Sequence, residues 1–142
     1  MAKDKFKYEV CFSCSDPDFW RFNLFMIAVG YDADGGRVSF EDFSERIYET
    51  EYGGALRTHP VDYDIHRSAR LVCDGCAYVE VYVYAIANTL PASEVIRDTP
   101  EFPARLAVSA DGEAVMDSEY TVNPWGGLTI VALRADARDR QK

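Results

Sequence analysis

The sequence has little of what most catalytic sites and membrane anchors require. It contains only two histidines, His59 and His66, and neither stands in a motif with a serine, a thiol or metal-ligand spacing. No glycine-rich phosphate loop follows a predicted strand. The apolar stretch 22–29 is far shorter than the roughly 20 residues that a membrane-spanning helix needs. We therefore predict a protein that is not an enzyme and does not insert into a membrane.

Positive charge is also scarce. The 142 residues include 15 Lys and Arg against 24 Asp and Glu, which gives a formal net charge of -9. Such a chain repels phosphate backbones and anionic lipid surfaces, so direct binding to nucleic acid or to a membrane is not expected. An acidic surface complements a basic protein, including one that itself binds nucleic acid. The alternative is that the charge serves solubility alone.

Segments that direct secretion are not evident at the start of the sequence. Residues 1–7 are basic but no apolar run follows them, which does not fit an ordinary signal peptide. We therefore expect a cytoplasmic protein, in which thiols stay reduced. Its four cysteines are then free, catalytic or bound to a metal rather than joined in disulfides.

The clearest pattern that is present is the alternation of residues 77–88. Aliphatic side chains fall on one side of an extended strand, and mainly tyrosines fall on the other: Val79, Val81, Val83 and Ala85 against Tyr78, Glu80, Tyr82 and Tyr84. We predict a central strand of an antiparallel sheet, with its aliphatic side on the core and its tyrosine side at least partly in water.

Other segments also have the pattern of strands. They are residues 5–13, 19–31, 61–72, 104–109, 114–122 and 128–133. Residues 22–31 are apolar on both faces, so a buried helix that begins with Asp16 as N-cap and Pro17 is the alternative there. Two Asp-Gly pairs, at 74–75 and 111–112, predict hairpins. The last strand is apolar on both faces, so we expect it inside a sheet.

One helix is predicted, at residues 39–52. Phe40, Phe43 and Ile47 share a helical face, Ser39 can cap its start, and two glycines follow its end. About seven strands and one helix indicate an all-β, mainly antiparallel β-sandwich or partly open barrel. The whole chain, 1–142, is expected to form a single domain, with a frayed charged tail at about 135–142.

The cysteines form two Cys-x-x-Cys pairs. Four thiolates from Cys11, Cys14, Cys73 and Cys76 could hold a structural zinc ion, and paired knuckles are the usual way to build such a site. The alternative is that they are ordinary packed thiols, since free cysteine behaves as a small hydrophobe. A redox dithiol is disfavoured because the βαβ setting of that motif is missing.

Residues 32–43 contain two aspartates and a glycine followed by a predicted helix. Asp32, Asp34, Gly36, Val38 and Asp42 resemble the ligand, turn and apolar positions of an EF-hand calcium loop. The match holds only if the fifth loop residue is deleted. An Asp-Gly turn before a capped helix accounts for the same residues.

Tyrosine and acidic side chains form the candidate binding site. Tyrosines are favoured in protein interfaces because they are rigid and amphipathic. We assign binding to Tyr78, Glu80, Tyr82 and Tyr84, with Asp42, Glu45 and Glu49 of the predicted helix. The alternative is that this helix simply packs over the tyrosines. Paired acids such as Asp62 and Asp64 are more typical of solvated surface than of catalysis.

These features favour a non-enzymatic, acidic protein-binding module. An inhibitor or immunity-type protein that neutralises a basic partner fits them, since a negative field raises the rate of association. One alternative is a structural subunit or homodimer that self-associates through a sheet edge such as residues 128–133. The other is a small domain stabilised by a zinc site made of the four cysteines.

Overall fold

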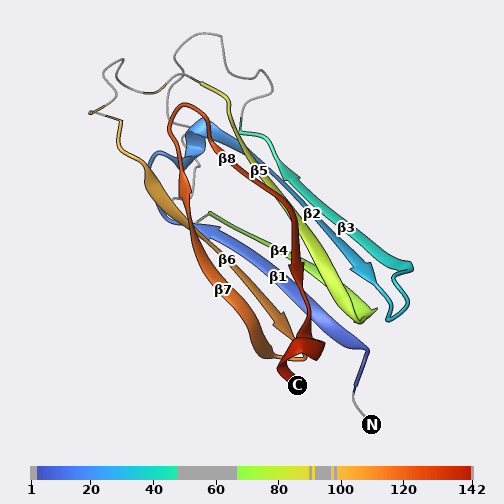
Figure 1. Cartoon of the computed structure of the whole chain (residues 1–142). Coiled ribbons are helices and arrows are strands. Elements are labelled where there is room, and N and C mark those ends of the chain that lie inside the picture. The colour runs from blue at the N-terminus through green and yellow to red at the C-terminus, as the bar shows by residue number, and fades with distance from the viewer. Residues whose placement is uncertain (1–2, 48–66, 90, 92–96, 98, 142) are drawn as a thin grey trace.

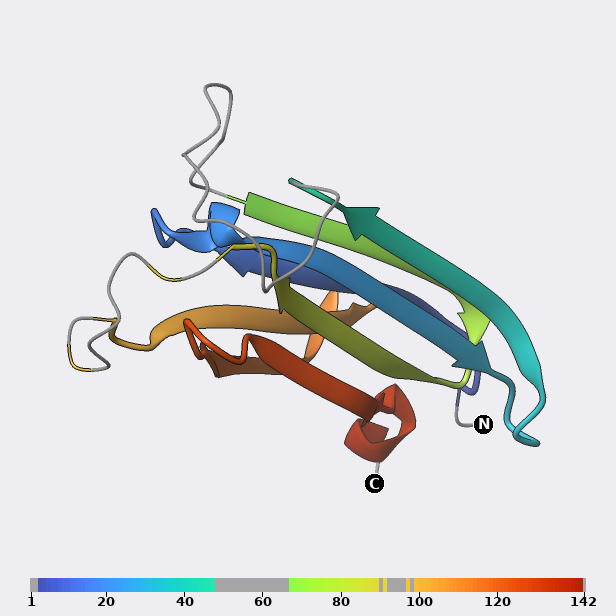
Figure 2. The same cartoon turned by 90° about the horizontal axis from the view of Figure 1, so that it is seen from above.

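Two four-stranded antiparallel sheets pack face to face in the computed structural model (Figures 1 and 2), which describes residues 3–47, 67–89, 91, 97 and 99–141. The strands are β1 Phe6–Cys14, β2 Phe22–Tyr31, β3 Arg37–Glu45, β4 Arg67–Cys76, β5 Tyr78–Ala87, β6 Phe102–Ala110, β7 Glu113–Val122 and β8 Leu128–Ala135. The first sheet has the order β4-β1-β6-β7 and the second β3-β2-β5-β8. The prediction of an antiparallel β-sandwich is confirmed.

The core lies between the two sheets and is built by strict alternation. On β1 the side chains of Tyr8, Val10 and Phe12 are fully buried. On β5 the same holds for Val79, Val81 and Val83, which face them from the second sheet. Burial of each such side chain contributes about 1.5–3 kcal/mol of transfer free energy. The predictions for strand 5–13 and for the central strand 77–88 are therefore confirmed.

The apolar run at 22–31 is a strand and not a helix. Residues 19–21 form a short 3-10 turn, and β2 follows directly. Strand β2 pairs with β3 on one side and β5 on the other, so it lies inside its sheet. This position explains why both of its faces are apolar, because one faces the core and the other the opposite surface of the sheet.

The helix predicted at 39–52 is wrong for the residues that the structure describes. Residues 37–45 form β3, and residues 48–52 lie outside the described residues. Antiparallel pairing with β2 provides the backbone hydrogen bonds that a helix would have made internally. In the strand, Phe43 turns toward the core and Phe40 turns to the opposite face, where it is 54% exposed.

The Asp74–Gly75 pair does not form the predicted hairpin. Strand β4 pairs with β1, whereas β5 pairs with β2 and β8, so the chain passes here from one sheet to the other. Gly75 has a φ of 73°, which is costly for other residues, and the β1–β4 register shifts at this point. The Asp-Gly pair is therefore part of a bulge at a crossing between sheets. The second predicted hairpin, around Asp111 and Gly112, is confirmed by the pairing of β6 with β7.

Strand β8 lies at the edge of its sheet and not inside it. It pairs with β5 alone, and Val131 is 61% exposed. The apolar side chains on its inner side pack on the core, as they would in an interior strand. On its outer side Val131 is exposed to solvent, so the apolar residues there do not indicate burial.

The end of the chain is not a frayed tail as far as the structure describes it. A 3-10 helix, η3 Ala137–Gln141, follows β8, and both Asp136 and Ala137 are buried. The first and last described residues lie at the same end of the sandwich (Figure 1). Contacts from β1 and β5, rather than composition, hold this segment in place.

Candidate protein-binding face

The outer face of the β3-β2-β5-β8 sheet gathers most of the described aromatic residues that lie outside the core. Residues paired directly across antiparallel strands point to the same side of a sheet. The pairings place one continuous set of side chains on this face: Phe40 and Asp42 from β3, Phe25, Ile27, Val29 and Tyr31 from β2, and Tyr78, Glu80, Tyr82, Tyr84 and Ile86 from β5. We call this set the tyrosine face.

Much of the tyrosine face contacts solvent. Phe40 is 54% exposed and Ile86 is 38% exposed. Tyr78, Tyr82 and Tyr84 are half-buried by their neighbours on the sheet. Isolated apolar residues on a surface are common, but a contiguous apolar area of this kind is typical of a binding surface.

One end of the tyrosine face is closed by stacked groups. The rings of Tyr31 and Tyr78 stack with centroids 4.9 Å apart and planes 14° apart. Guanidinium groups of Arg134 and Arg138 lie 4.0 and 5.4 Å from the Tyr78 ring centroid. Burial, followed by the interaction with the neighbouring Glu80 carboxylate, raises the pKa of the Tyr31 phenol, so this group stays neutral at physiological pH.

The opposite end of the tyrosine face also carries an arginine, whereas the charged residues at its centre are two acids. Arg46 lies over the Phe25 ring at 5.5 Å. In the middle, Ile27 pairs with Asp42 on one side and Tyr82 on the other, while the next row of the face contains Glu80. The centre therefore combines an open aromatic ring with two carboxylates at opposite corners of an apolar area. Such a surface suits a lysine or arginine side chain, which gains both cation–π and ionic contacts.

The predicted binding residues divide into three groups. Tyr78, Glu80, Tyr82 and Tyr84 lie together on the tyrosine face, and Asp42 joins them from β3. Glu45 does not, because it pairs with Leu24 on the inner side of β3 and forms an ion pair with Arg67. Glu49 lies outside the described residues.

Sequence reasoning missed several members of the face. Phe25 and Ile27 belong to the stretch 22–31, which is apolar on both faces, so the sequence does not distinguish its outer residues from its core residues. Phe40 lies in the segment for which the sequence predicts a helix. Residues 39–43, Ser-Phe-Glu-Asp-Phe, have no period-two alternation of apolar and polar side chains, so no local signal identifies them as a strand. With the helix absent from residues 39–47, this segment does not cover the tyrosines.

The four cysteines do not come together. Cys11 and Cys14 are three residues apart on a regular strand, so their side chains point to opposite faces of the sheet. Cys73 and Cys76 both point inward only because the bulge at Asp74–Gly75 adds a residue between them. No group of three or more potential ligands among the described residues is arranged to hold a metal ion. The expectation of a zinc site made of the four cysteines is therefore corrected, because Cys11 and Cys14 face opposite sides of the sheet and Cys14 lies at the other end of the β1–β4 pair from Cys73 and Cys76.

The buried thiols are also poorly reactive. Burial raises the pKa of Cys14 and Cys73, and burial together with the neighbouring Cys73 raises the pKa of Cys76 to about 11. These thiols stay protonated at neutral pH, whereas nucleophilic and redox-active cysteines require the thiolate.

The segment that resembles a calcium loop is a strand connection. The Asp32 carboxylate accepts hydrogen bonds from the backbone N–H groups of Asp34 and Gly36, at 2.9 and 2.8 Å. The helix that would follow an EF-hand loop is replaced by β3. The Asp32 side chain therefore shapes the turn between β2 and β3, as aspartate does in many turns.

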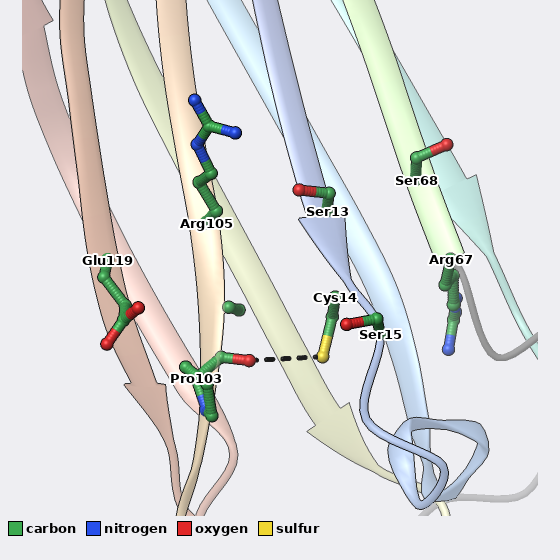
Figure 3. A pocket seen from close by; sticks show the side chains of 9 residues that line it. Ser13, Cys14, Ser15, Arg67, Ser68, Pro103, Arg105 and Glu119 are labelled. Carbon is green, nitrogen blue, oxygen red and sulfur yellow. Dashed lines mark hydrogen bonds between the residues drawn. The ribbon is translucent and has the colours of Figure 1, made fainter.

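A surface hollow of about 460 Å³ lies where β1 and β6 separate (Figure 3). The Cys14 thiol donates to the Pro103 carbonyl at 3.5 Å, and Ser13, Ser15 and Ser68 also line the hollow. Arg105 also lines the hollow but is paired with Asp117 at 2.7 Å. A protonated thiol directed at a carbonyl, without an adjacent base among the described lining residues, is not an activated nucleophile.

Comparison with known protein families, with characterised proteins and with solved structures gives no significant match. In the described part of the chain, no helix combines the length and the apolar character needed to cross a membrane. His59, His66, Asp62 and Asp64 lie outside the described residues. The surfaces described above are therefore the basis for a proposal about function.

Proposed function

We propose that this protein is a non-enzymatic binding module, of the inhibitor or immunity type, whose tyrosine face binds a basic partner protein. The observation that supports the proposal is the open centre of that face, where Tyr82 lies in an apolar area flanked by Asp42 and Glu80. Tyrosine is enriched among the residues that dominate binding energies, and its hydroxyl keeps an exposed ring soluble.

The net charge of the chain adds a long-range electrostatic attraction to the short-range contacts that the tyrosine face would make with a partner. The net charge of -9 produces a negative field that attracts a basic protein and increases its association rate. Arg134 and Arg138 of the chain itself lie over the Tyr78 ring, and this geometry supports the idea that rings of the face can bind guanidinium groups. A partner that presents arginine or lysine on a protruding segment would make the same contact at Tyr82.

The test compares variants that change the face with variants that make the same chemical change elsewhere. A partner is first isolated from lysate with the wild-type chain and then produced pure, and its affinity is measured by calorimetry. Tyr82→Ala and Asp42→Lys should each weaken binding at least about tenfold, a loss of roughly 1.4 kcal/mol. Tyr120→Ala, a half-buried tyrosine on β7, and Asp34→Lys, an exposed acid in a turn, should have much smaller effects.

The control Asp34→Lys is the decisive one, because it changes the net charge as much as Asp42→Lys does. If both lysine variants weaken binding equally, the acidic charge alone attracts the partner and the tyrosine face is not its site. Salt gives a second readout, since binding to a basic partner should weaken steeply as ionic strength rises. A partner whose affinity does not depend on salt would contradict the proposal.

A further inference from the structure

The core of the sandwich is covered less completely on one side, where an edge strand of one sheet lies beside an edge strand of the other. Among the residues that the structure describes, six partly buried hydrophobic side chains pack against the core, and five of these lie on β7 and β8: Val115, Met116, Tyr120, Leu128 and Leu133. Strands β7 and β8 are the edge strands on the same side of the sandwich, one in each sheet (Figure 1). The core is therefore partly open to solvent between them, and we call this strip the β7–β8 seam.

Charge is missing from the seam. About 27% of the residues of the chain are charged, yet residues 128–133 of β8 contain none. On β7, Asp117 and Glu119 alternate with Met116 and Tyr120, so the acids point to the outer side of their sheet and away from the seam. Depletion of charge together with partly buried Met and Tyr side chains is typical of the centre of a protein interface.

Strand β8 can also accept a further strand. It pairs with β5 on one edge only, and its other edge has no strand partner among the described residues. Unlike many edge strands, it carries neither proline nor lysine to prevent pairing. Val131, which is 61% exposed, adds an apolar side chain next to this edge.

We propose that a second copy of this chain occupies the seam, with β8 pairing antiparallel to β8 of the copy about a two-fold axis. Two molecules that each carry a charge of -9 repel one another over most of their surfaces. Contact between copies is least unfavourable where neither presents negative charge, and residues 128–133 of β8 are such a place. The pairing joins the two β3-β2-β5-β8 sheets into one sheet and places two tyrosine faces side by side.

The bulge in β8 limits the strength of this dimer. Val131 and Ala132 together oppose the single residue Tyr82, which interrupts the hydrogen-bond ladder at that point. The dimer should therefore form reversibly over protein concentrations from about 10 µM to about 1 mM, as small interfaces do.

Sedimentation velocity over that concentration range, at about 50 and about 500 mM NaCl, tests the proposal. The average mass should rise from 16.0 kDa toward twice that value as the concentration increases. Added salt should strengthen the dimer, because it screens the repulsion between two acidic copies. This is opposite in sign to the salt effect expected for the basic partner, so failure of one proposal can be told from failure of the other.

Matched lysine variants locate the interface. Val131→Lys should weaken dimerisation at least about tenfold, and Thr129→Lys on the same strand should do the same. Val38→Lys changes a valine that is also more than half exposed, at 51%, on the far edge strand β3 and should leave the dimer intact. A chain that stays monomeric at about 1 mM, a Val131→Lys dimer of unchanged affinity, or equal loss in Val38→Lys would each overturn the proposal.

Discussion

The hydroxyl group of Tyr8 joins the first strand to the end of the chain. It accepts a hydrogen bond of 2.9 Å from the backbone N–H of Ala137 and donates one of 2.6 Å to the carbonyl of Ala77. All three residues are fully buried. One side chain of β1 therefore satisfies backbone groups in the β4–β5 crossing and at the start of η3.

Removal of that hydroxyl should destabilise the protein although the ring is kept. In Tyr8→Phe the Ala77 carbonyl and the Ala137 N–H remain buried without this partner, which costs about 1–3 kcal/mol. Urea unfolding followed by tryptophan fluorescence measures the change. Tyr84→Phe, on the half-exposed tyrosine face, is the control and should change stability by less than about 0.5 kcal/mol. Equal effects of the two variants would show that Tyr8 does not have this role.

Asp136 should make the stability of the fold depend on pH in the acid range. Its burial alone would raise its pKa, but hydrogen bonds from Arg138 and Arg134 outweigh this and hold the pKa at about 2. Because the pKa in the folded state lies below the ordinary value of 3.8, the ionised carboxylate stabilises the fold above about pH 4. That contribution, about 2 kcal/mol, is lost as the pH falls from about 4 to about 2.

Asp136→Asn isolates this contribution from those of other carboxylates. The variant should be less stable than the wild type at pH 7, and the difference should shrink as the pH falls through the same range. Thermal unfolding at a series of pH values provides the measurement. A difference between the two proteins that stays constant from pH 7 to about pH 2.5 would rule out the assigned role.

Arg67 anchors the end of the sandwich opposite to η3. Its buried guanidinium donates to the carbonyls of Phe19, Phe22 and Glu45, at 3.2, 2.7 and 3.1 Å, and lies 4.8 Å from the Phe19 ring centroid. Arg67→Lys should cost about 1–3 kcal/mol, because an ammonium group cannot span three carbonyls that a planar fork reaches.

A second arginine serves as the control for that measurement. Arg70 lies three residues along β4 and is bonded to Glu9 on the exposed face. Arg70→Lys should change the free energy of unfolding by less than about 0.5 kcal/mol, since exposed ion pairs contribute little. If Arg67→Lys were as mild as Arg70→Lys, the three carbonyls would be satisfied in another way.

The strands that alternate clearly could be predicted from the sequence, and those whose pattern has two explanations could not. Residues 77–88 show one period only, so their strand and the position of Tyr82 on its outer side follow directly. Phe40 and Phe43 are compatible with both a helical face and the two sides of a strand. Pairing with β2 decides between these, and no local signal in residues 39–47 contains that information.

The candidate site was partly predictable for the same reason. Its β5 members share one strand, whereas Phe25 and Asp42 join them through pairings between segments distant in the sequence. The zinc hypothesis is a case in which a local sequence pattern led to a wrong site prediction. Cys-x-x-Cys spacing suits a knuckle, but on a regular strand it sends Cys11 and Cys14 to opposite faces, and only the strand assignment reveals this.

Ala132 is the position where the backbone of β8 is most constrained. Its φ of 50° lies in the left-handed region, which costs a residue with a Cβ about 1 kcal/mol relative to glycine. Ala132→Gly should remove that cost, although glycine loses more conformational entropy on folding, so we expect a net stabilisation of about 0.5 kcal/mol. Ala114→Gly, at an exposed position of β7 without a positive φ, should instead destabilise by about 0.5–1 kcal/mol. Chemical unfolding of the two variants measures the change in the free energy of unfolding, which should be positive for Ala132→Gly and negative for Ala114→Gly. If Ala132→Gly destabilised the protein as much as Ala114→Gly does, the bulge would not be strained.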